Sequence, residues 1–467
     1  MSGPMSGPMS GPLREPMSNP MSPRVRLDTI RECFEGVIPA VLATSDRDGM
    51  PNVSYLTQVQ YVDREHVALS YQFFNKTRAN ILANPQVKMI VVSPQTAAQY
   101  QLTMQFQRTE TSGALFESMR AKLAGIASHV GMCGVFQLLG SDVFRVTDVA
   151  LLPGERLPAP AGERNLLAAL RVCSERLQGC RDLDRLFDET LRCLDEKFGI
   201  DHAMLLMLDA PGASLYTVAS HGYTDSGIGS EIAMGEGVIG VAARMRTPIR
   251  IGHMTTEYGY GRAIRAQLED SARAGELAEQ IPLPGLPGSR SQLAVPISAG
   301  ERTLGVLYVE SDQDLRFTYD DEDALVALAA QFGLAMTVLQ GAAPEPAAVA
   351  APAQLPVTAG EPLVIRHFSA TDSVFFGDDY LIKGVAGRVL WSLVQDYVQR
   401  GRSAFTNREL RLDPRIRLPD VNDNLEARLV LLARRLAERN CPVRIEKTGR
   451  GTFRLAVQRP LALVAVG

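Results

Sequence analysis

Hydrophobic and polar positions follow three different patterns along the chain, which predicts three folded modules. From residue 25 to 150, short apolar runs are separated by turn signals such as Asp46–Gly49 and Asp63–Glu65, a pattern typical of strands. From residue 165 to 340, helical spacing alternates with apolar strand-like runs. From residue 363 to 467, short strand signals precede helical ones. We therefore expect an α+β multidomain protein.

The first module is expected to be mostly β-structure. Its strands are predicted at Val37–Thr44, Asn52–Tyr61, His66–Tyr71, Val87–Val92 and Gly140–Asp148. Its helices are predicted at Thr77–Ala83, ended by Asn84-Pro85, and at Glu117–Ile126.

The second module is expected to have a central antiparallel sheet with helices on one face. Helical spacing covers Asn165–Phe198, Gly237–Met245 and Thr318–Val338. Strands are predicted at Ala203–Leu208, Ser214–Ser220, Gln292–Ile297 and Thr303–Val309. Between them, Tyr258–Arg290 is a long polar insertion, and loops of that length are usually functional lids or disordered.

The third module is expected to combine short strands, three helices and a closing hairpin. The strands are predicted at Val364–Phe368, Ser373–Phe376 and Tyr380–Ile382. The helices are predicted at Gly387–Gln399, Thr406–Leu410 and Asn424–Glu438, and the hairpin strands at Val443–Lys447 and Thr452–Val457. Thr406 and Glu409 have the spacing of a capping box.

The segments outside the modules have biased compositions. Residues 1–24 are a Met-Ser-Gly-Pro repeat that cannot bury apolar surface, so disorder is expected. Residues 151–164 and 341–362 are expected to be linkers, the second an extended and semi-rigid Ala/Pro segment.

Overall composition is that of an ordinary globular protein, with 46% apolar and 21% charged residues and a net charge of -4. No apolar run approaches the ~20 residues needed to span a bilayer. The six cysteines form no C-x-x-C pair, so no metal site is expected from them. We expect a cytoplasmic protein without membrane contact.

Isolated histidines and cysteines are given core roles. His202, His221 and His253 could bind haem or a metal, but no ligand spacing supports this, and a structural role is preferred. The cysteines of the helical region are interpreted as small core residues: Cys173, Cys180 and Cys193.

Charge is distributed unevenly along the chain. Residues 402–459 carry fourteen Lys or Arg against seven Asp or Glu, a local net charge of +7 in a chain of net -4. A basic region segregated from an acidic remainder is the electrostatic footprint of nucleic-acid binding. Double-stranded DNA is therefore the expected partner of the third module.

The first module contains a candidate phosphate site. After Phe73-Phe74 a helix begins, where backbone amides, Lys and Arg together favour an anion, and Ser, Thr and Asn side chains can add neutral hydrogen bonds. The pattern K-x-R-x-N, followed by Asn-Pro and a strand, resembles the pyridoxamine-phosphate-oxidase-like split β-barrel, over about Thr29–Asp148. That resemblance implies FMN, with Lys76, Arg78 and Asn80 at its phosphate side, Asn75 and Thr77 beside them, and Ser54 and Leu56 near the isoalloxazine ring.

Other interpretations of this module stay open. Related barrels bind haem, a deazaflavin or nothing, and Lys76 and Arg78 could be an ordinary solvated helix start. The Arg- and Trp-containing segment that ends the true oxidase is not matched here, so its activity is not carried over. His129 is either a cofactor neighbour or, as we prefer, a core or capping residue.

The second module resembles a GAF domain, an α/β sandwich with an antiparallel sheet. The resemblance covers Leu166–Gln340 and rests on GEGVIG (Gly235–Gly240), SQLAVPIS, TLGVLYVES and AAQFGLAM in order. It implies sensing of a small molecule or dimerisation, without identifying a ligand. Tyr258 and Tyr260 are candidate pocket residues, and a core without any ligand is the alternative.

The third module resembles the winged helix-turn-helix effector domain of response-regulator-type transcription factors. Asn424–Arg439 is similar to the recognition helix and Ile445–Leu455 to the wing. The resemblance implies that cations on these two elements contact DNA: Arg428, Arg434, Arg435, Lys447 and Arg450. Asp423 and Glu426 depart from a phosphate-attracting pattern, and protein contacts are the alternative use of this surface.

Together these features predict a sensor and transcriptional regulator that couples flavin or small-ligand sensing to DNA binding. No catalytic residue is assigned. Two alternatives remain: an FMN-dependent oxidoreductase with regulatory appendages, and a non-catalytic interaction scaffold. Since the first two families commonly form dimers, we expect a homodimer that could bind two DNA half-sites.

Overall fold

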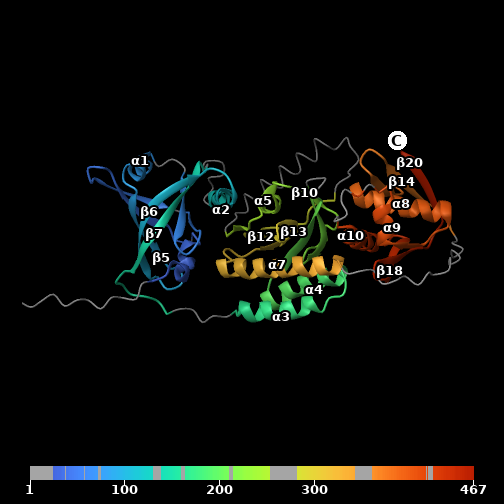
Figure 1. The fold of residues 1–467 in the computed structure, drawn as a ribbon, viewed down its shortest axis with the longest axis horizontal. Coiled ribbons are helices and arrows are strands. Elements are labelled where there is room, and N and C mark those ends of the chain that lie inside the picture. The colour runs from blue at the N-terminus through green and yellow to red at the C-terminus, as the bar shows by residue number, and fades with distance from the viewer. Residues whose placement is uncertain are drawn as a thin grey trace, which may run out of the picture.

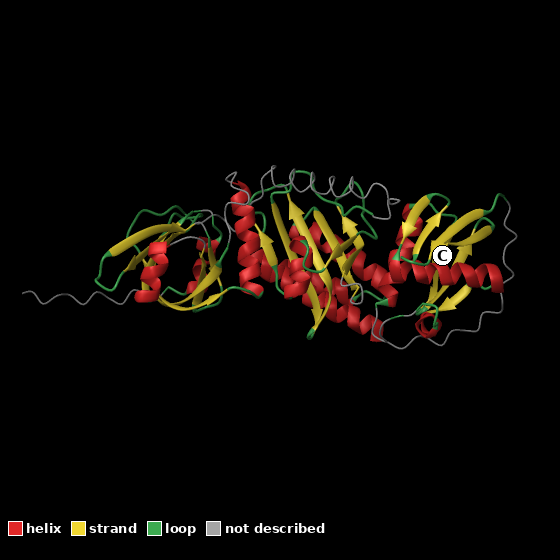
Figure 2. Ribbon diagram, turned by 90° about the horizontal axis from the view of Figure 1, so that it is seen from above, coloured by secondary structure: helices red, strands yellow, loops and turns green. Residues whose placement is uncertain are grey.

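The computed structural model describes residues 25–36, 38–56, 58–71, 75–129, 138–158, 164–209, 214–252, 281–341, 360–416, 418 and 424–466. These residues form three modules in a row, each with its own sheet or sheets (Figures 1 and 2). The segments with sequence-based expectations outside the described residues include the repeat 1–24, residues 159–163 of the first linker, residues 258–280 of the insertion, and residues 342–359 of the Ala/Pro linker.

The first module, here called the barrel, is a curled antiparallel sheet with strand order β2-β1-β5-β6-β7-β4-β3 (Figure 1, blue to cyan). Its elements are η1 (Leu27–Phe34), β1 (Ala40–Ser45), β2 (Pro51–Leu56), β3 (Val59–Tyr61), β4 (His66–Tyr71), α1 (Asn75–Ala83), β5 (Gln86–Val92), β6 (Gln99–Glu110), α2 (Ala114–His129) and β7 (Gly140–Leu151).

The barrel differs from the expectation in two places. The single strand expected over 52–61 is two strands, β2 and β3, which lie at opposite edges of the sheet. Strand β6 was not predicted, although it has twelve residues. Four glutamines alternate with the buried or half-buried side chains of β6, so its mean hydropathy is low even though Leu102 and Met104 are fully buried in the barrel core.

The second module has a six-stranded antiparallel sheet with the order β10-β9-β8-β13-β12-β11. Its elements are α3 (Leu166–Gln178), α4 (Leu183–Phe198), β8 (His202–Asp209), β9 (Ser214–His221), β10 (Glu231–Ala233), α5 (Gly237–Met245), β11 (Ile249–Ile251), β12 (Ser291–Ala299), β13 (Arg302–Ser311) and α7 (Tyr319–Gly341).

Helices cover both faces of this sheet, which corrects the expectation of one covered face. Leu307 and Val309 pack in the core formed with α3, α4 and α7, whereas Val306 and Tyr308 pack in the core formed with α5. Burial on both faces explains why the strands are continuous apolar runs rather than alternating ones. The helical spacing expected over 165–198 corresponds to two helices, α3 and α4, and α4 begins where the Asp182 side chain accepts a hydrogen bond from the Arg185 amide (2.9 Å).

Helix α7 is long and apolar enough, by length and composition alone, to cross a membrane. The expectation that no apolar stretch approaches that length was therefore too strict. In this structure α7 packs on β12 and α3, and residues such as Leu325, Leu328 and Phe332 are fully buried. These contacts are those of the core helix of a folded domain.

The C-terminal module contains two small sheets and three helices (Figure 1, orange to red). Its elements are β14 (Leu363–Phe368), β15 (Ser373–Phe376), β16 (Asp379–Ile382), α8 (Gly384–Arg400), β17 (Ala404–Thr406), α9 (Asn407–Leu412), α10 (Leu425–Glu438), β18 (Val443–Gly449), β19 (Thr452–Val457) and β20 (Leu461–Val466). The sheets have the orders β16-β15-β14-β20 and β17-β19-β18. Strand β20, which was not predicted, pairs with β14 in parallel.

Local signals in this module are confirmed. Thr406 caps α9 by accepting from the Glu409 amide, and the Glu409 side chain accepts from the Thr406 amide, which completes the capping box. The hairpin β18–β19 forms as expected, but it does not close the module, because β20 follows it.

Helix α7 contacts both neighbouring modules. At its first residue, the Tyr319 side chain is buried in the barrel core, and its hydroxyl accepts a hydrogen bond from the Tyr61 amide (3.2 Å). At its other end, the Gln340 amide donates to the Asn424 side chain (2.9 Å) at the start of α10. A single helix of the middle module therefore joins the barrel to the C-terminal module (Figure 1).

Candidate functional site

The expected phosphate site lies where α1 begins beside β2. The Thr77 hydroxyl is buried, 2.7 Å from the Ser54 hydroxyl, and accepts a hydrogen bond from the Asn52 amide group (2.9 Å). The structure thus brings together two of the predicted residues, Ser54 and Thr77. Asn52 was missed, although the β-strand period of two places it on the same face as Ser54.

Arg78 is held by groups that the sequence analysis did not connect with it. Its guanidinium bonds both carboxylate oxygens of Asp142 and donates to the Thr109 hydroxyl (2.9 Å). It also lies over the Tyr71 ring, 4.2 Å from the centroid. Asp142 is on β7, so this ion pair ties α1 to the far side of the sheet and neutralises the Arg78 charge.

The other predicted residues divide between exposed and buried positions. Lys76 is exposed at the first turn of α1. Asn80 is buried and donates to the Thr44 hydroxyl (3.2 Å), which is a packing role. Leu56 is buried, and the side chain of Asn75 lies outside the described residues.

A small pocket that is open to solvent lies beside these groups, with about 260 Å³ of space that includes part of the solvent. Its apolar wall comes from four strands and α1: Leu42, Leu56, Leu69, Ile81 and Phe144. Its polar rim consists of Ser70, Tyr71, Thr77, Arg78 and Asp142. A cavity with an apolar wall and a few polar groups at one end is the general form of a small-molecule site.

A second cluster, of buried charges, lies between the barrel and the middle module. Arg250 on β11 is 2% exposed, and it donates to Glu35 (2.6 Å), Glu322 (2.8 Å) and the Phe317 carbonyl (3.1 Å). Glu35 comes from the barrel and Glu322 from α7. The sequence contains one signal for this cluster, an arginine between Ile249 and Ile251 in an apolar strand. The sequence analysis did not interpret it as part of a site.

Tyr319 is at the centre of the same cluster. Three cations lie over its ring, with centroid distances of 4.3 Å for Arg250, 4.9 Å for Arg31 and 5.0 Å for Lys122. Burial raises the pKa of the Tyr319 hydroxyl. Burial, together with the nearby Arg250 charge, lowers the pKa of Lys122 from its ordinary 10.5 to about 8.

The five cations predicted to contact DNA are all described, and four of them face the middle module. Arg428 bonds Asp209 (2.9 Å), and Arg434 bonds Asp184 (2.8 Å) and Asp188 (2.6 Å). On the hairpin, Lys447 lies 3.1 Å from Asp182, and Arg450 donates to the Leu339 carbonyl (3.4 Å). Arg435 instead points into its own module, where it bonds the Leu381 carbonyl and Glu438.

Only some of the candidate histidines and cysteines lie within the described residues. Cys173, Cys180 and Cys193 are buried in the core, as predicted. His202 contacts the Tyr223 ring edge-on, and His221 lies 3.7 Å from Asp195. His253, Tyr258, Tyr260 and the side chain of His129 lie outside the described residues. Within the described ranges, no three His, Cys, Asp or Glu side chains are grouped to hold a metal ion.

Comparison with known protein families assigns the first two modules. Residues 27–142 match the pyridoxamine 5'-phosphate oxidase family, and residues 182–336 match the GAF domain family. The chain carries a pyridoxamine 5'-phosphate oxidase-like domain followed by a GAF domain. The barrel is the first of these and the middle module is the second. A search of the curated proteins finds no match.

Solved structures resemble single modules of the chain. The GAF domain of an Acinetobacter phosphoenolpyruvate-protein phosphotransferase is 20% identical, with 38% of this chain and 95% of that chain covered and a TM-score of 0.30. An FMN-binding protein from Syntrophomonas wolfei is 14% identical (27% and 86% covered, TM-score 0.24). HupZ from Group A Streptococcus is 21% identical (26% and 95% covered, TM-score 0.21).

The barrel residues fit the phosphate end of a flavin nucleotide. Ser54 and Thr77 share one hydrogen bond, which leaves one of their two hydroxyl protons to donate to an anion. The exposed Lys76 ammonium is a further donor, and the first turn of α1 contains no acid that would repel an anion. Arg78 contributes less positive charge than the motif alone suggests, because Asp142 is bonded to it. One chain therefore offers the phosphate end and part of a ring site.

Proposed function

We propose that the protein is a sensor in which FMN at the barrel and the state of the GAF domain control DNA binding by the C-terminal module. The observation that carries the flavin part is the donor group at the start of α1, beside an apolar cavity. The match of residues 27–142 to the pyridoxamine 5'-phosphate oxidase family supports the same cofactor. When bound, FMN would supply a redox-active group. Ser54, Lys76 and Thr77 would hold its phosphate, and the apolar wall would contact its ring.

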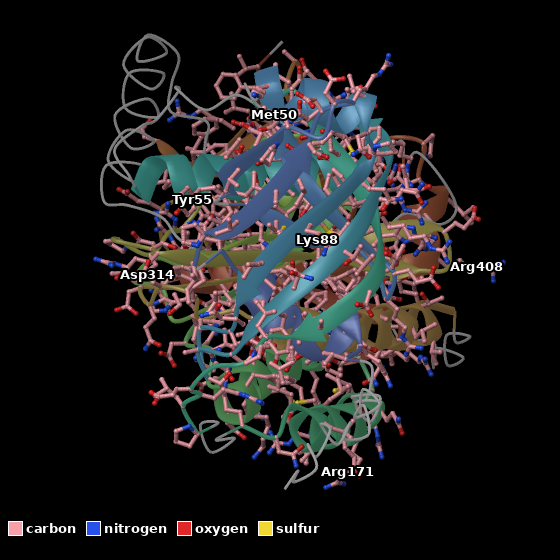
Figure 3. All side chains as sticks on the ribbon, turned by 90° about the vertical axis from the view of Figure 1, so that its left-hand side faces the viewer. Met50, Tyr55, Lys88, Arg171, Asp314 and Arg408 are labelled. Carbon is pink, nitrogen blue, oxygen red and sulfur yellow. The ribbon has the colours of Figure 1, made fainter. Side chains whose placement is uncertain are left out.

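A second copy of the chain is part of this proposal. Strand β2 is an edge of the barrel sheet, and its side chains Val53 and Tyr55 are 61% and 73% exposed. Figure 3 looks onto the free end of the barrel and labels Tyr55 together with Met50, which is also exposed. Exposed apolar groups on an edge strand favour a protein contact there. A monomer in sedimentation equilibrium would contradict this part.

The DNA-binding part rests on charge and element order. In the C-terminal module three strands precede α8, the short α9 and α10 follow, and a hairpin with Lys447 and Arg450 comes next, before the last strand β20. This order supports a winged helix-turn-helix, in which α10 would be the recognition helix and the hairpin the wing. The local charge of +7 favours a phosphate backbone. Failure of the full chain to retain duplex DNA at low salt would contradict DNA binding.

The flavin part is tested by titrating the full chain, freed of bound flavin, with FMN and with riboflavin, and following flavin fluorescence. Lys76→Gln removes an exposed cation from the phosphate end. A hydrogen bond to a charged group contributes about 1.5–3 kcal/mol, so FMN should bind about tenfold more weakly or worse. Riboflavin lacks the phosphate, so its affinity should not change.

Lys88→Gln is the matched control for this titration. Lys88 is an equally exposed lysine on β5, on the face of the barrel that Figure 3 shows. The control should bind FMN as the unmodified chain does. Equal weakening of FMN by both substitutions, or no preference of the unmodified chain for FMN over riboflavin, would contradict the phosphate site.

A further inference from the structure

The α10 surface that would enter a DNA groove is turned toward helix α4 of the GAF domain. Arg434 bonds Asp184 and Asp188, one turn apart on α4, and its guanidinium also donates to the Asp184 carbonyl (3.1 Å). The Arg434 side chain is only 17% exposed, while Asp184 and Asp188 are 58% and 55% exposed. The arginine is thus covered by acids that remain hydrated.

The same arrangement extends to both sides of Arg434. Arg428 is 3% exposed, bonded to Asp209 and 5.3 Å from the centroid of the Tyr216 ring. Lys447 of the hairpin lies 3.1 Å from Asp182, the residue that caps α4. We call Asp182, Asp184, Asp188 and Asp209 the acidic docking face. Its four carboxylates meet three cations that belong to the expected recognition helix and wing.

Apolar contacts support this interface between the ion pairs. Gly229 of the GAF domain lies so close to the C-terminal module that a Cβ there would be 3.1 Å from the Ile382 side chain and 3.9 Å from Leu431. Leu431 and Ile382 belong to a hydrophobic core that is continuous with the core of the GAF domain. The contact therefore combines buried apolar surface with charge pairing.

We infer that the acidic docking face holds the C-terminal module in a state that cannot bind DNA, because its carboxylates occupy the cations that DNA phosphates would bind. This inference rests on the proposed DNA binding and adds its regulation. DNA and the GAF domain compete for Arg428, Arg434 and Lys447. The measured affinity for DNA is then the intrinsic affinity multiplied by the undocked fraction.

The competition also determines how the affinity for DNA changes with salt concentration. Salt weakens cation–phosphate contacts, which lowers DNA affinity. Salt weakens the docking ion pairs as well, which raises the undocked fraction. In the intact chain the two effects partly cancel. A chain with a weakened docking face should show the steeper loss of DNA affinity with salt.

The test uses the full chain and a pool of random-sequence duplex DNA, with affinity measured over a series of salt concentrations. The variant is D184N together with D188N, whose side chains are more than half exposed, so the fold should be retained. Exposed ion pairs contribute up to about 1 kcal/mol, so DNA binding should become about fivefold tighter at low salt. Hydrogen exchange of the α10 amides should become faster in the absence of DNA.

The control is D195N together with E196Q, which removes the same charge from the other end of α4. Asp195 and Glu196 face His221 and Arg176, not α10. The control should match the unmodified chain in affinity, salt slope and hydrogen exchange.

Two outcomes would overturn the inference. If the unmodified chain binds DNA and the D184N/D188N chain binds it equally, with the same salt slope, then docking does not limit binding, although DNA binding stands. If neither chain binds DNA at low salt while α10 exchange still becomes faster, the proposed DNA binding fails and its regulation fails with it.

Discussion

Substitution of Arg250 by methionine tests whether the buried charge cluster joins the barrel to the GAF domain. Methionine has a similar length and no charge, so it leaves Glu35 and Glu322 without their shared cation. The Glu35 side chain is 9% exposed and Glu322 is 23% exposed, so water can hydrate these carboxylates only in part. Removing one partner of a buried ion pair costs about 3–5 kcal/mol. We expect a loss of that size in the free energy of unfolding.

The assay is urea unfolding followed by far-ultraviolet circular dichroism. Fluorescence would be less informative, because the only tryptophan, Trp391, lies in α8 of the C-terminal module. A matched control is Arg171→Met. Arg171 pairs with Glu175 on the surface of α3, with both side chains more than 60% exposed, and its loss should cost less than about 1 kcal/mol.

A double-mutant cycle refines the same test. Glu35→Gln removes the carboxylate charge on the barrel side and keeps an oxygen that can accept from the Tyr319 amide. The combination of Arg250→Met and Glu35→Gln should cost less than the sum of the single substitutions, by about 0.5–3 kcal/mol. Strict additivity, or an Arg250→Met cost no larger than that of Arg171→Met, would refute the argument that this pair links the two domains.

Two further predictions concern Lys122 and Thr406. The folded chain binds the Lys122 proton more weakly than the unfolded chain, because its pKa is lowered from 10.5 to about 8. Unfolding free energy should therefore rise between pH 8 and 10.5 by about 3 kcal/mol relative to a Lys122→Met chain, and parallel pH profiles of the two chains would count against this. Thr406→Ala removes the capping box of α9 and should cost about 0.5–2 kcal/mol in urea unfolding, whereas Thr406→Ser should restore most of it.

Sequence patterns predicted the central strands of the GAF domain, whose side chains are almost all apolar. The strands around Leu205 and Leu307 are buried on both faces, so their residues form unbroken apolar runs that can be recognised without a structure. Strand β6 was missed because its outward residues are glutamines. Strand β20 was missed although its six residues are all apolar. Its pairing with β14 joins residues almost a hundred positions apart, a relation that no local pattern contains.

For the candidate sites too, local sequence patterns could not show which distant residues lie beside them. The K-x-R-x-N pattern located Lys76 and Arg78, but it could not show that Asp142, 64 residues later, neutralises the arginine. The basic region was equally visible from the sequence. Its orientation depends on Asp184 and Asp188, about 250 residues before Arg434. Charge composition predicts what a surface can bind, whereas only the fold determines which partner is next to it.

The central claim, that flavin binding at the barrel controls DNA binding at the other end of the chain, is tested most directly by one measurement. The affinity of the full chain for duplex DNA is determined at fixed low salt, without FMN and with FMN at saturation. Coupling between two sites typically amounts to 1–3 kcal/mol, so the account predicts a change in DNA affinity of at least about fivefold. The same DNA affinity with and without bound FMN would contradict it.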